Sequence, residues 1–531
     1  FSYEGIHSGD RLSKPLISGA EVDWETALGA TAKDLKGVII RHGVDAVGFL
    51  VSPTATVEEL YLAQKLARGL GVTNIDHRLR QADFSDQDMA PVFPWLGQRL
   101  EDLEKIKAVL LIGSNVRMEQ PLAGHRLRKA ALDGGRIMFI NPRDFEFRFP
   151  VAAKVVADPV GMVAALAGVA QAIAELKGEP IPARLGLARL ANLITGSMVG
   201  DTERAIAAHL VNNAPATVLL GNLAVSHPSF AQIRALAGFV ALCGGARLGY
   251  LPEAANSVGG WLTGALPHRL PGGKSTPEAG SDVRSMLDLP RKAYVLIGVE
   301  PELDCWDGAA ALKAMQTAEF VVSLSPYASV AGYVKVILPV AAFAETSGTY
   351  VNAEGRWQSF QGASKPFGEA RPTWKVLRVL GNLCGVQGFD YVSSEDVLAE
   401  ARSICGNIQP DNTIQPDNTL SVGQPDWWPF LAGGLLRVAD VPIYAIDPLV
   451  RRARSLQASP LAQSTEVRLH PDVAHELGVA ERDRVQVRQN GAVVDLPLVL
   501  DDSVPRGCAW IPAGLPDSIM LGPAVGPVSI Q

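Results

Sequence analysis

Cysteine is scarce in this sequence. Five cysteines occur in 531 residues, and no two of them form a CxxC pair; the closest two are Cys384 and Cys405. A disulfide scaffold is therefore excluded. The spacing also leaves no local motif from which a cysteine-built zinc or iron–sulfur site could be assembled.

The sequence has no excess of positive charge and no long apolar run. Lysine and arginine number 48 against 55 aspartates and glutamates, a formal charge of −7, which argues against a nucleic-acid-binding protein. The longest nearly apolar run, residues 159–174, is shorter than the roughly 20 residues of a bilayer span. Its alanines and glycines predict a buried helix, so we expect no direct membrane span.

The first residue is Phe1, and the opening residues contain no basic segment followed by an apolar one, so no signal peptide is visible. Because the sequence does not begin with methionine, we expect it to start partway through a longer protein. Its length predicts three or four domains, and a hydrophobic content of 47% suffices for large cores.

A repeated pattern of apolar run, Gly/Asn/Ser turn and helix predicts the fold class. Such a repeat is typical of α/β domains with parallel sheets and right-handed crossovers. Ligands of these sheets bind outside the carboxyl ends of the strands, although glycines there are more simply interpreted as tight turns. No GxGxxG motif is present. The runs are Ala46–Val51, Ala108–Ile112, Arg136–Ile140, Ala216–Leu220, Tyr294–Ile297 and Phe320–Leu324.

The C-terminal part has a different character. Residues 408–419 repeat the hexapeptide IQPDNT twice, which predicts a surface loop or linker. From about Thr465 alternating strands follow, with Asn490-Gly491 as a hairpin turn, and these predict a small β-barrel-like domain. The predicted organisation is a linking segment at 1–40, a discontinuous α/β domain at 41–100 and 251–400, an inserted α/β domain at 101–250, a linker at 401–464 and the barrel at 465–531.

Several segments together resemble the molybdopterin oxidoreductase family. They are residues 338–356 (LPVAAFAETSGTYVNAEGR), Gly113-Ser-Asn115 with Asn141-Pro-Arg143, residues 251–259 (LPEAANSVG) and the C-terminal stretch that contains residues 470–507. The resemblance covers nearly the whole chain. It implies a pterin cleft between α/β domains, for which the candidates are Gly113, Asn115, Asn141, Arg143 and Asn352. We expect Gly348 to lie at a turn that requires positive φ.

The residue that would hold the family's metal departs from the pattern. Family members carry a Cys, selenocysteine or Ser ligand in a loop that resembles residues 74–83 here, and the ligand position is Ala82. Alanine has no lone pair to donate, and Asp83 or Ser85 could replace it only with a shifted backbone. The resemblance therefore implies no metal ligand, no catalytic residue and a lapsed cofactor site. Arg80, Arg143 and Arg356 could hold an anion, but we favour pairing of each with a carboxylate.

Within the family, the chain resembles the G-subunit group of bacterial NADH–quinone oxidoreductases, respiratory complex I. The resemblance rests on residues 1–17 (FSYEGIHSGDRLSKPLI) and on residues 345–356 (ETSGTYVNAEGR). It implies a structural, cofactor-free body of a subunit that carries electrons from NADH toward quinone. The 4Fe-4S and 2Fe-2S clusters would lie upstream of residue 1. The partners would be other subunits of the peripheral arm, at the cytoplasmic face of the bacterial inner membrane.

Two alternatives stay open at this point. The first is a molybdopterin-dependent oxidoreductase similar to formate dehydrogenase, which predicts a pterin cofactor and a metal ligand near residues 80–85. The second is an assembly protein that binds a guanine dinucleotide or no ligand. His77, His125 and His227 lie near candidate loops and are interpreted as structural or surface residues.

Overall fold

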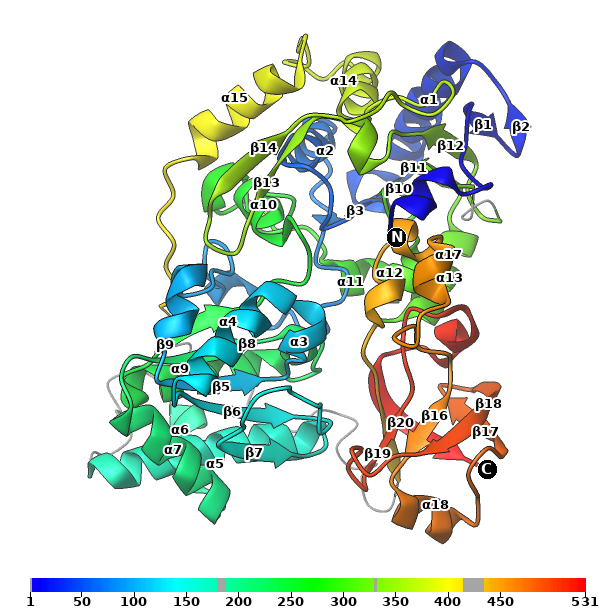
Figure 1. Ribbon diagram of the computed structural model, residues 1–531. Helices are drawn as coiled ribbons and strands as arrows, with labels where there is room; N and C mark the ends of the chain where they lie inside the picture. The colour runs from blue at the N-terminus through cyan, green and yellow to red at the C-terminus, as the bar shows by residue number, and fades with distance from the viewer. Residues whose placement is uncertain (1, 179–187, 329–331, 414–433) are drawn as a thin grey trace. The chain divides into compact units, whose positions relative to one another are not determined.

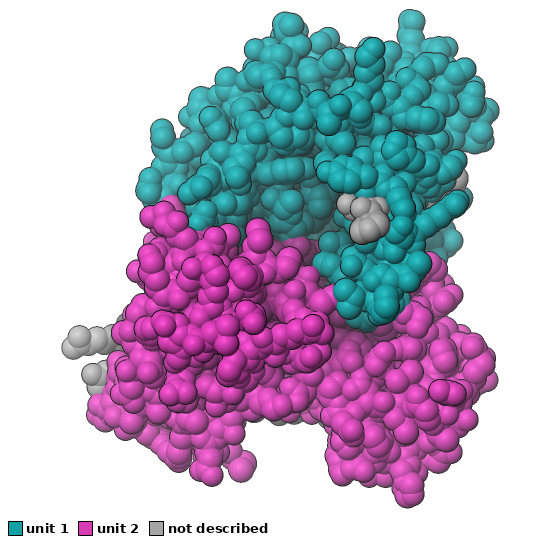
Figure 2. Space-filling model, in the orientation of Figure 1, with its two compact units in different colours: residues 1–79, 254–409, 442–463 teal, residues 80–253, 410–441, 464–531 magenta. Residues whose placement is uncertain are grey.

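The computed structural model describes residues 2–178, 188–328, 332–413 and 434–531, which form two compact units (Figure 1, Figure 2). Unit 1 contains residues 1–79, 254–409 and 442–463, and unit 2 contains residues 80–253, 410–441 and 464–531. Both units contain a parallel sheet covered by helices, and unit 2 also contains a closed barrel. The predicted α/β fold with a C-terminal barrel is therefore confirmed.

Unit 1 is built on a seven-stranded sheet of order β2-β1-β12-β11-β10-β3-β4. The strands from β12 to β4 are parallel, and β1 and β2 extend the sheet in antiparallel fashion. The central strands are buried along their whole length, as expected for a parallel sheet with helices on both faces. The bounds are β1 (Leu16–Ile17), β2 (Ala20–Glu21), β3 (Val47–Val51), β4 (Ile75–Asp76), β10 (Ala293–Ile297), β11 (Phe320–Ser325) and β12 (Val336–Pro339).

Capping side chains position the helices of unit 1. Thr56 and Glu59 form a reciprocal capping box at the start of α2, and Asp23 caps α1. The longer helices are α1 (Trp24–His42), α2 (Val57–Gly69), α13 (Gly308–Thr317), α14 (Thr373–Cys384) and α15 (Ser394–Cys405), and the shorter ones are α10 (Ser257–Leu262), α11 (Val283–Asp288), α12 (Pro301–Asp304), α16 (Pro448–Arg451) and α17 (Arg454–Gln457).

The segment at residues 345–356, which carries part of the family resemblance, forms a hairpin in unit 1. Strands β13 (Gly348–Val351) and β14 (Trp357–Phe360) pair in antiparallel register. Buried Glu58 on α2 fixes the hairpin, because its carboxylate accepts the N–H of Thr349 at 2.9 Å and its hydroxyl at 2.8 Å. The prediction of a positive φ at Gly348 is wrong, since Gly348 lies within β13. A Cβ at this position would instead lie 2.3 Å from Cγ2 of Thr56.

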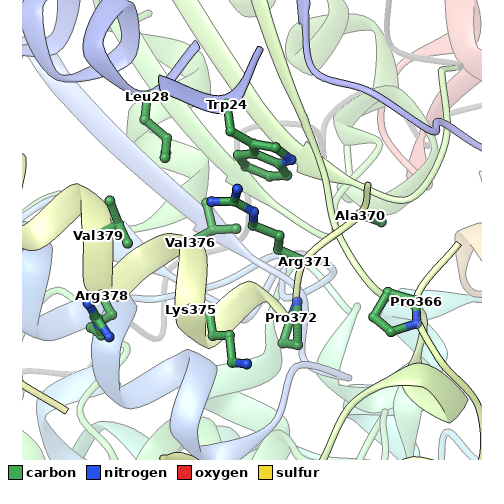
Figure 3. Close-up of a pocket in the computed structure, with 10 residues that line it drawn as sticks. All are labelled: Trp24, Leu28, Pro366, Ala370, Arg371, Pro372, Lys375, Val376, Arg378 and Val379. Carbon is green, nitrogen blue, oxygen red and sulfur yellow. The ribbon is translucent and has the colours of Figure 1, made fainter. Parts of the chain in front are cut away.

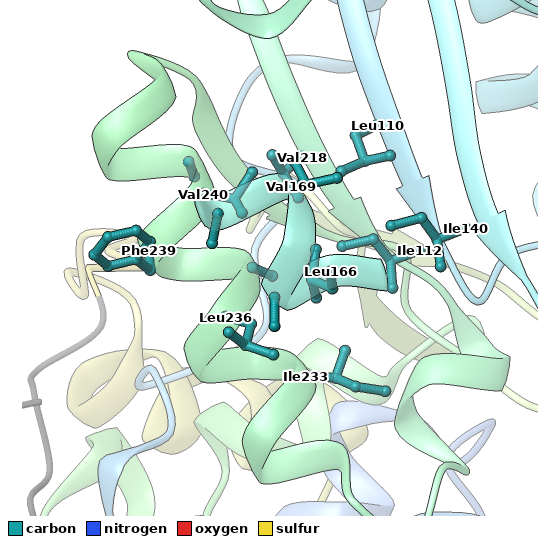
Figure 4. Close-up of a cluster of buried hydrophobic side chains, with 14 of the residues drawn as sticks. Leu110, Ile112, Ile140, Leu166, Val169, Val218, Ile233, Leu236, Phe239 and Val240 are labelled. Atoms are coloured by element: carbon teal, nitrogen blue, oxygen red, sulfur yellow. The ribbon is translucent and has the colours of Figure 1, made fainter. Parts of the chain in front are cut away.

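Unit 2 contains a five-stranded parallel sheet of order β7-β6-β5-β8-β9. A large apolar cluster lies between the sheet and the helices α5 and α9 (Figure 4). The strands are β5 (Ala108–Ile112), β6 (Arg136–Asn141), β7 (Ala153–Val156), β8 (Ala216–Leu220) and β9 (Arg247–Tyr250), and the helices are α3 (Val116–Glu119), α4 (Pro121–Leu132), α5 (Pro159–Lys177), α6 (Ala188–Thr195), α7 (Asp201–Asn212), α8 (Asn222–Val225) and α9 (Phe230–Gly244).

Helix α5 has 19 residues and is the one described helix that is long and apolar enough to cross a bilayer. Leu166 and Val169 of this helix are fully buried, and Figure 4 shows them facing strand residues such as Ile112 and Val218. The predicted buried helix at residues 159–174 is therefore confirmed.

The barrel of unit 2 has the order β15-β19-β16-β18-β17-β20. Its first strand comes from residues 435–438, within the stretch that the sequence pattern assigned to a linker. The predicted Asn490-Gly491 turn joins β17 to β18, with φ of 49° and 83° at the two residues. The bounds are β15 (Leu435–Val438), β16 (Val467–Leu469), α18 (Pro471–Leu477), β17 (Arg484–Gln489), β18 (Ala492–Leu500), β19 (Cys508–Trp510) and β20 (Val525–Ile530).

The tandem repeat is described only in its first copy, which has no helix or strand. Asn412 of this copy is buried and bridges two segments of unit 2. Its amide N–H donates to the carbonyl oxygens of Trp95 at 2.7 Å and Leu248 at 2.9 Å. The second copy, residues 414–419, lies outside the described residues.

Candidate functional site

The sheet of unit 2 has a switch point between β5 and β8, because β6 and β7 extend it on one side and β9 on the other. In open α/β sheets the ligand crevice lies at such a point, outside the carboxyl ends of the strands. Gly113 follows β5 there and Gly221 follows β8. This edge of unit 2 is therefore the expected place for a bound ligand.

The chain itself closes the switch point. The N–H groups of Leu223 and Ala224 donate to the carbonyl oxygen of Gly113 at 2.9 and 3.3 Å. A Cβ at Gly113 would lie 2.3 Å from the nitrogen of Ala224, and a Cβ at Gly221 would lie 2.5 Å from the Gly113 oxygen. Both glycines are thus required by the direct packing of two turns, and the N–H groups that could face a phosphate are used within the protein.

Asn141, at the end of β6, is fully buried and joins the same edge. Its side-chain oxygen accepts the N–H of Ser114 at 2.8 Å, and its amide donates to the Ser114 carbonyl at 3.0 Å. Asn115, the next candidate, donates its backbone N–H to the Glu119 carboxylate at 3.3 Å. The structure therefore brings Gly113, Asn115 and Asn141 together through contacts within the chain.

Arg143 follows β6 and binds residues of the C-terminal barrel region. Its guanidinium donates to the Asp501 carboxylate at 2.6 Å and to the Ser503 hydroxyl at 2.9 Å, and it lies 5.1 Å from the centre of the Trp510 ring. Although burial opposes ionisation, the Ser503 hydrogen bonds and the charge of Arg143 hold the pKa of Asp501 below its usual value. The described contacts of Arg143 are those of a paired structural arginine.

The loop around Ala82 is fixed against α9. Ala82 is fully buried, and its N–H approaches the Val225 carbonyl oxygen at 3.4 Å. The Asp83 carboxylate accepts the N–H groups of Ala231 at 2.9 Å and Ser85 at 3.0 Å. Asp83 is therefore committed to the N-terminus of α9, while Ser85 is exposed.

Three carboxylates that no sequence motif singled out lie near the same strand ends: Glu119, Glu253 and Asp440. Burial raises the pKa of Glu119 to about 8, and the charges of Asp440 and Glu253 add to this rise. Arg80 pairs with Glu253 at 3.0 Å. Glu253 belongs to one of the segments that carry the family resemblance, but no local pattern in the sequence indicates that Asp440 and Glu119 meet it.

Two polar atoms at this edge of unit 2 have no hydrogen-bond partner among the described residues. They are the hydroxyl oxygen of Ser114 and the side-chain oxygen of Asn222. Both follow strands that flank the switch point. A small ligand that carries hydrogen-bond donors could satisfy them.

The remaining candidates, Asn352 and Arg356, lie in unit 1. The Asn352 side chain accepts the backbone N–H groups of Glu354 and Arg356, both at 3.0 Å, and so closes the turn between β13 and β14. Arg356 is exposed, and the carboxylate of Glu354 lies 3.9 Å away from it. The structure therefore gives Asn352 a turn-forming role in unit 1.

The three histidines occupy different environments. His77 is buried, with Nδ1 2.9 Å from the Ala265 oxygen, and His125 is exposed. His227 binds the Pro159 carbonyl and the Ser229 N–H, and burial lowers its pKa to about 4. Over the described ranges, no group of three or more His, Cys, Asp or Glu side chains could hold a metal ion.

Comparison with known proteins gives the family. The family model "Molybdopterin oxidoreductase" matches residues 11–383, and "Molydopterin dinucleotide binding domain" matches residues 449–529. The chain belongs to the molybdopterin oxidoreductase family. The second match contains Asp501 and Ser503, the partners of Arg143.

Three curated relatives show the range of the family that this chain is similar to. It is 26% identical to NADPH-Fe(3+) oxidoreductase subunit alpha of Geobacter sulfurreducens, over 72% of this chain and 50% of the relative. It is 28% identical to the G subunit of the NADH-quinone oxidoreductase of Streptomyces coelicolor, over 96% of this chain and 62% of the relative. It is also 28% identical to F420-dependent formate dehydrogenase subunit alpha of Methanocaldococcus jannaschii, over 76% of this chain and 67% of the relative.

The chain thus spans about half the length of the first of these relatives and about two thirds of the others. Among solved structures, acetylene hydratase from Pelobacter acetylenicus has a TM-score of 0.73 at 15% identity. That match covers 100% of this chain and 93% of the hydratase. At this identity the likeness concerns the fold alone.

Proposed function

We propose that residues 1–531 form the structural body of an electron-transfer subunit, of the type of the NADH–quinone oxidoreductase G subunit, in which the family's cofactor site has lapsed. The observation that carries this proposal is the closed switch point of unit 2. There the Gly113 carbonyl accepts the N–H groups of Leu223 and Ala224, so these donors are not available to a dinucleotide.

The charges at the same edge support the proposal. A dinucleotide cofactor carries phosphates, which require hydrogen-bond donors and positive charge. Here Arg143 and Arg80 are paired with Asp501 and Glu253, and Glu119 adds a further carboxylate. This set of side chains does not fit an anionic ligand, and we derive no catalytic step from it.

Ala82 supports the proposal from the side of the metal. A methyl group offers no electron pair, and the neighbouring Asp83 is bound to the backbone N–H groups of Ala231 and Ser85. Asp83 would have to leave the N-terminus of α9 before it could serve as a ligand in place of Ala82.

The proposed role is structural. The chain would pack against other subunits of the peripheral arm, at the cytoplasmic face of the membrane, while the 4Fe-4S and 2Fe-2S clusters lie outside residues 1–531. Similarity to the Streptomyces coelicolor G subunit over 96% of this chain supports the assignment. The relatives' additional length leaves room for such a region.

A formate-dehydrogenase-like activity is the second candidate. Two observations favour it: the similarity to the Methanocaldococcus jannaschii protein, and the unpartnered atoms of Ser114 and Asn222 at the switch point, within the described residues. In this alternative a pterin ligand would satisfy both atoms.

Visible absorption and electron paramagnetic resonance of the purified chain separate the two candidates. The proposal predicts a silent spectrum before and after partial reduction, and no formate oxidation. A molybdenum signal with formate oxidation would establish the second candidate. Iron–sulfur features would contradict the proposed placement of the clusters outside residues 1–531.

The Ala82→Cys variant is the matched test of the lapsed ligand position. It is expected to stay spectroscopically silent, because one thiol cannot restore the other cofactor contacts. Acquisition of molybdenum by this variant would mean that the rest of the site is intact.

A further inference from the structure

Unit 1 contains a pocket of about 400 Å³ beside α1 and α14, and this pocket is distinct from the strand-end region of unit 2 (Figure 3). Its apolar lining comes from Trp24 and Leu28 of α1 and from Val376 and Val379 of α14. Trp24 and Leu28 are buried in the chain, and the Trp24 indole N–H donates to the Glu369 carbonyl at 2.9 Å. The pocket thus has a fixed apolar floor.

Three cationic side chains line the same pocket: Arg371, Lys375 and Arg378. The Arg371 guanidinium lies 4.5 Å from the centre of the Trp24 ring, and Figure 3 shows the side chain extended toward the indole. Arg378 donates to the Tyr391 carbonyl at 3.1 Å, while its Nε has no partner within the described residues. None of the three forms an ion pair with a carboxylate in the described part of the chain.

This concentration of positive charge is unexpected in a chain with a formal charge of −7. Other lysines of unit 1 are paired: Lys14 lies 3.8 Å from Glu21, and Lys335 lies 2.8 Å from Asp34 of α1. Cations that lack a carboxylate partner beside an apolar pocket are complementary to a ligand with negative charges and an apolar group.

The spacing of the cations indicates an extended ligand. Arg371 lies just before α14, and Lys375 and Arg378 lie within it, so the three span about 10 Å along the helix direction. A compact anion such as phosphate cannot contact both ends of that row. Near their C-terminal ends, α1 and α14 also expose Ile40 and Leu383, which adds apolar surface to these two helices.

We propose that this pocket, with its basic row, binds an acidic segment of a partner protein that inserts a bulky apolar side chain. The apolar side chain would occupy the pocket over Trp24 and Val376, and flanking carboxylates would pair with Arg371, Lys375 and Arg378. The proposal does not depend on the state of the cofactor site or on the proposed function.

The test uses the full chain and a fluorescein-labelled peptide, acetyl-EEDFLEDE-amide, with fluorescence anisotropy at low ionic strength. Lys375→Glu is expected to weaken peptide binding at least tenfold, because it removes one ion pair and adds repulsion. Arg371→Gln is expected to weaken it several-fold. Lys313→Glu is the matched control, since Lys313 is an exposed lysine on another helix of unit 1, and it should change the affinity less than twofold.

Further arms decide between occupants. Replacing Phe-Leu of the peptide by Ser-Ser should abolish binding, and raising the salt concentration should weaken binding of the original peptide. Equal binding by the wild-type chain and Lys375→Glu, equal binding of the serine peptide, or no peptide binding would overturn the proposal. Lys375-dependent binding to phosphatidylserine vesicles without peptide binding would assign the surface to a membrane instead. Circular dichroism of each variant checks that it is folded.

Discussion

The two parallel sheets use opposite charges at comparable places, the loops after their strands. In unit 1, Glu300 follows β10, and two arginines from residues 442–463 bind it: Arg451 at 2.8 Å and Arg452 at 2.7 Å. In unit 2, Arg143 follows β6, and Asp501, which follows β18, binds it at 2.6 Å. Each sheet thus has a charged strand-end residue held by a later part of the same unit.

The difference lies in what surrounds the two pairs. In unit 1, Arg451 also binds Asp304, and Arg452 also binds Asp10 and stacks on Tyr327 at 4.1 Å, so carboxylates and guanidinium groups are interleaved. In unit 2 the carboxylates of Glu119, Glu253 and Asp440 gather near the strand ends. The comparison teaches that a strand-end region can be stabilised without a ligand in two ways, one balanced in charge and one with excess negative charge.

Removing the balanced pair should have the largest effect. Arg451→Ala leaves Glu300 and Asp304 buried with one guanidinium fewer, and we expect a loss of about 3 kcal/mol in the stability of unit 1. Hydrogen exchange of peptides from β3 and β10 in increasing denaturant measures it. Arg41→Ala, which removes an exposed pair with Glu319, is the control and should cost under about 1 kcal/mol. Equal effects of the two variants would contradict a buried stabilising pair.

The excess negative charge in unit 2 should appear as a pH dependence. The folded pKa of Glu119 is raised to about 8, so its contribution is fully present below the unfolded pKa and is lost as pH rises through 8. We expect unit 2 to lose roughly 3 kcal/mol from this group between pH 5 and 8. In unit 1, Glu58 acts in the same direction, but its pKa, raised by burial to about 7, ends the loss earlier.

Glu119→Gln is expected to remove most of this slope in unit 2 and to leave stability at pH 5 unchanged. The exposed Glu476 of the same unit provides the control, since Glu476→Gln should keep the full slope. Hydrogen exchange of β5 and β8 peptides at several pH values follows the effect. An unchanged slope in Glu119→Gln would show that Glu119 does not carry the negative charge of this region.

Asp501→Asn should have a smaller effect on unit 2. It removes the ionised partner of Arg143 while keeping the size of the side chain, and we expect a cost of about 2 kcal/mol. Exchange of β6 peptides measures it. Asp502→Asn changes the adjacent exposed carboxylate and should be nearly neutral. Similar results for the two neighbours would argue against the Arg143 pair.

Arg356→Ala should have the smallest effect. Arg356 is exposed and 3.9 Å from Glu354, a geometry for which we expect less than about 0.5 kcal/mol. The midpoint of denaturant unfolding, reported by β13 and β14 peptides, is the readout. A loss as large as that expected for Asp501→Asn would mean that Arg356 has a role that its described contacts do not reveal.

The strands and the barrel could be predicted because their signals are local. Runs such as Ala108–Ile112 are buried strands of the predicted extent, and the Asn490-Gly491 turn has the positive φ values that a two-residue hairpin needs. Gly348 shows the limit of the same reasoning. Its need for glycine comes from contact with Thr56, which lies far earlier in the sequence, and not from its own backbone conformation.

The candidate site was predicted only in part, for a related reason. Gly113, Asn115 and Asn141 follow neighbouring strands, so the parallel sheet places them together. The partners that occupy this region are distant in sequence: Asp501 lies 358 residues after Arg143. Pairing over such a separation depends on how the barrel packs within unit 2, which no local pattern encodes.

The central claim is that the protein's own groups have replaced the cofactor in this chain. Molybdenum and tungsten content and released pterin, measured on the chain purified from a host whose own molybdoenzymes are active, test it most directly. The account predicts neither metal nor pterin in stoichiometric amount. About one metal ion and its pterin per chain would contradict it.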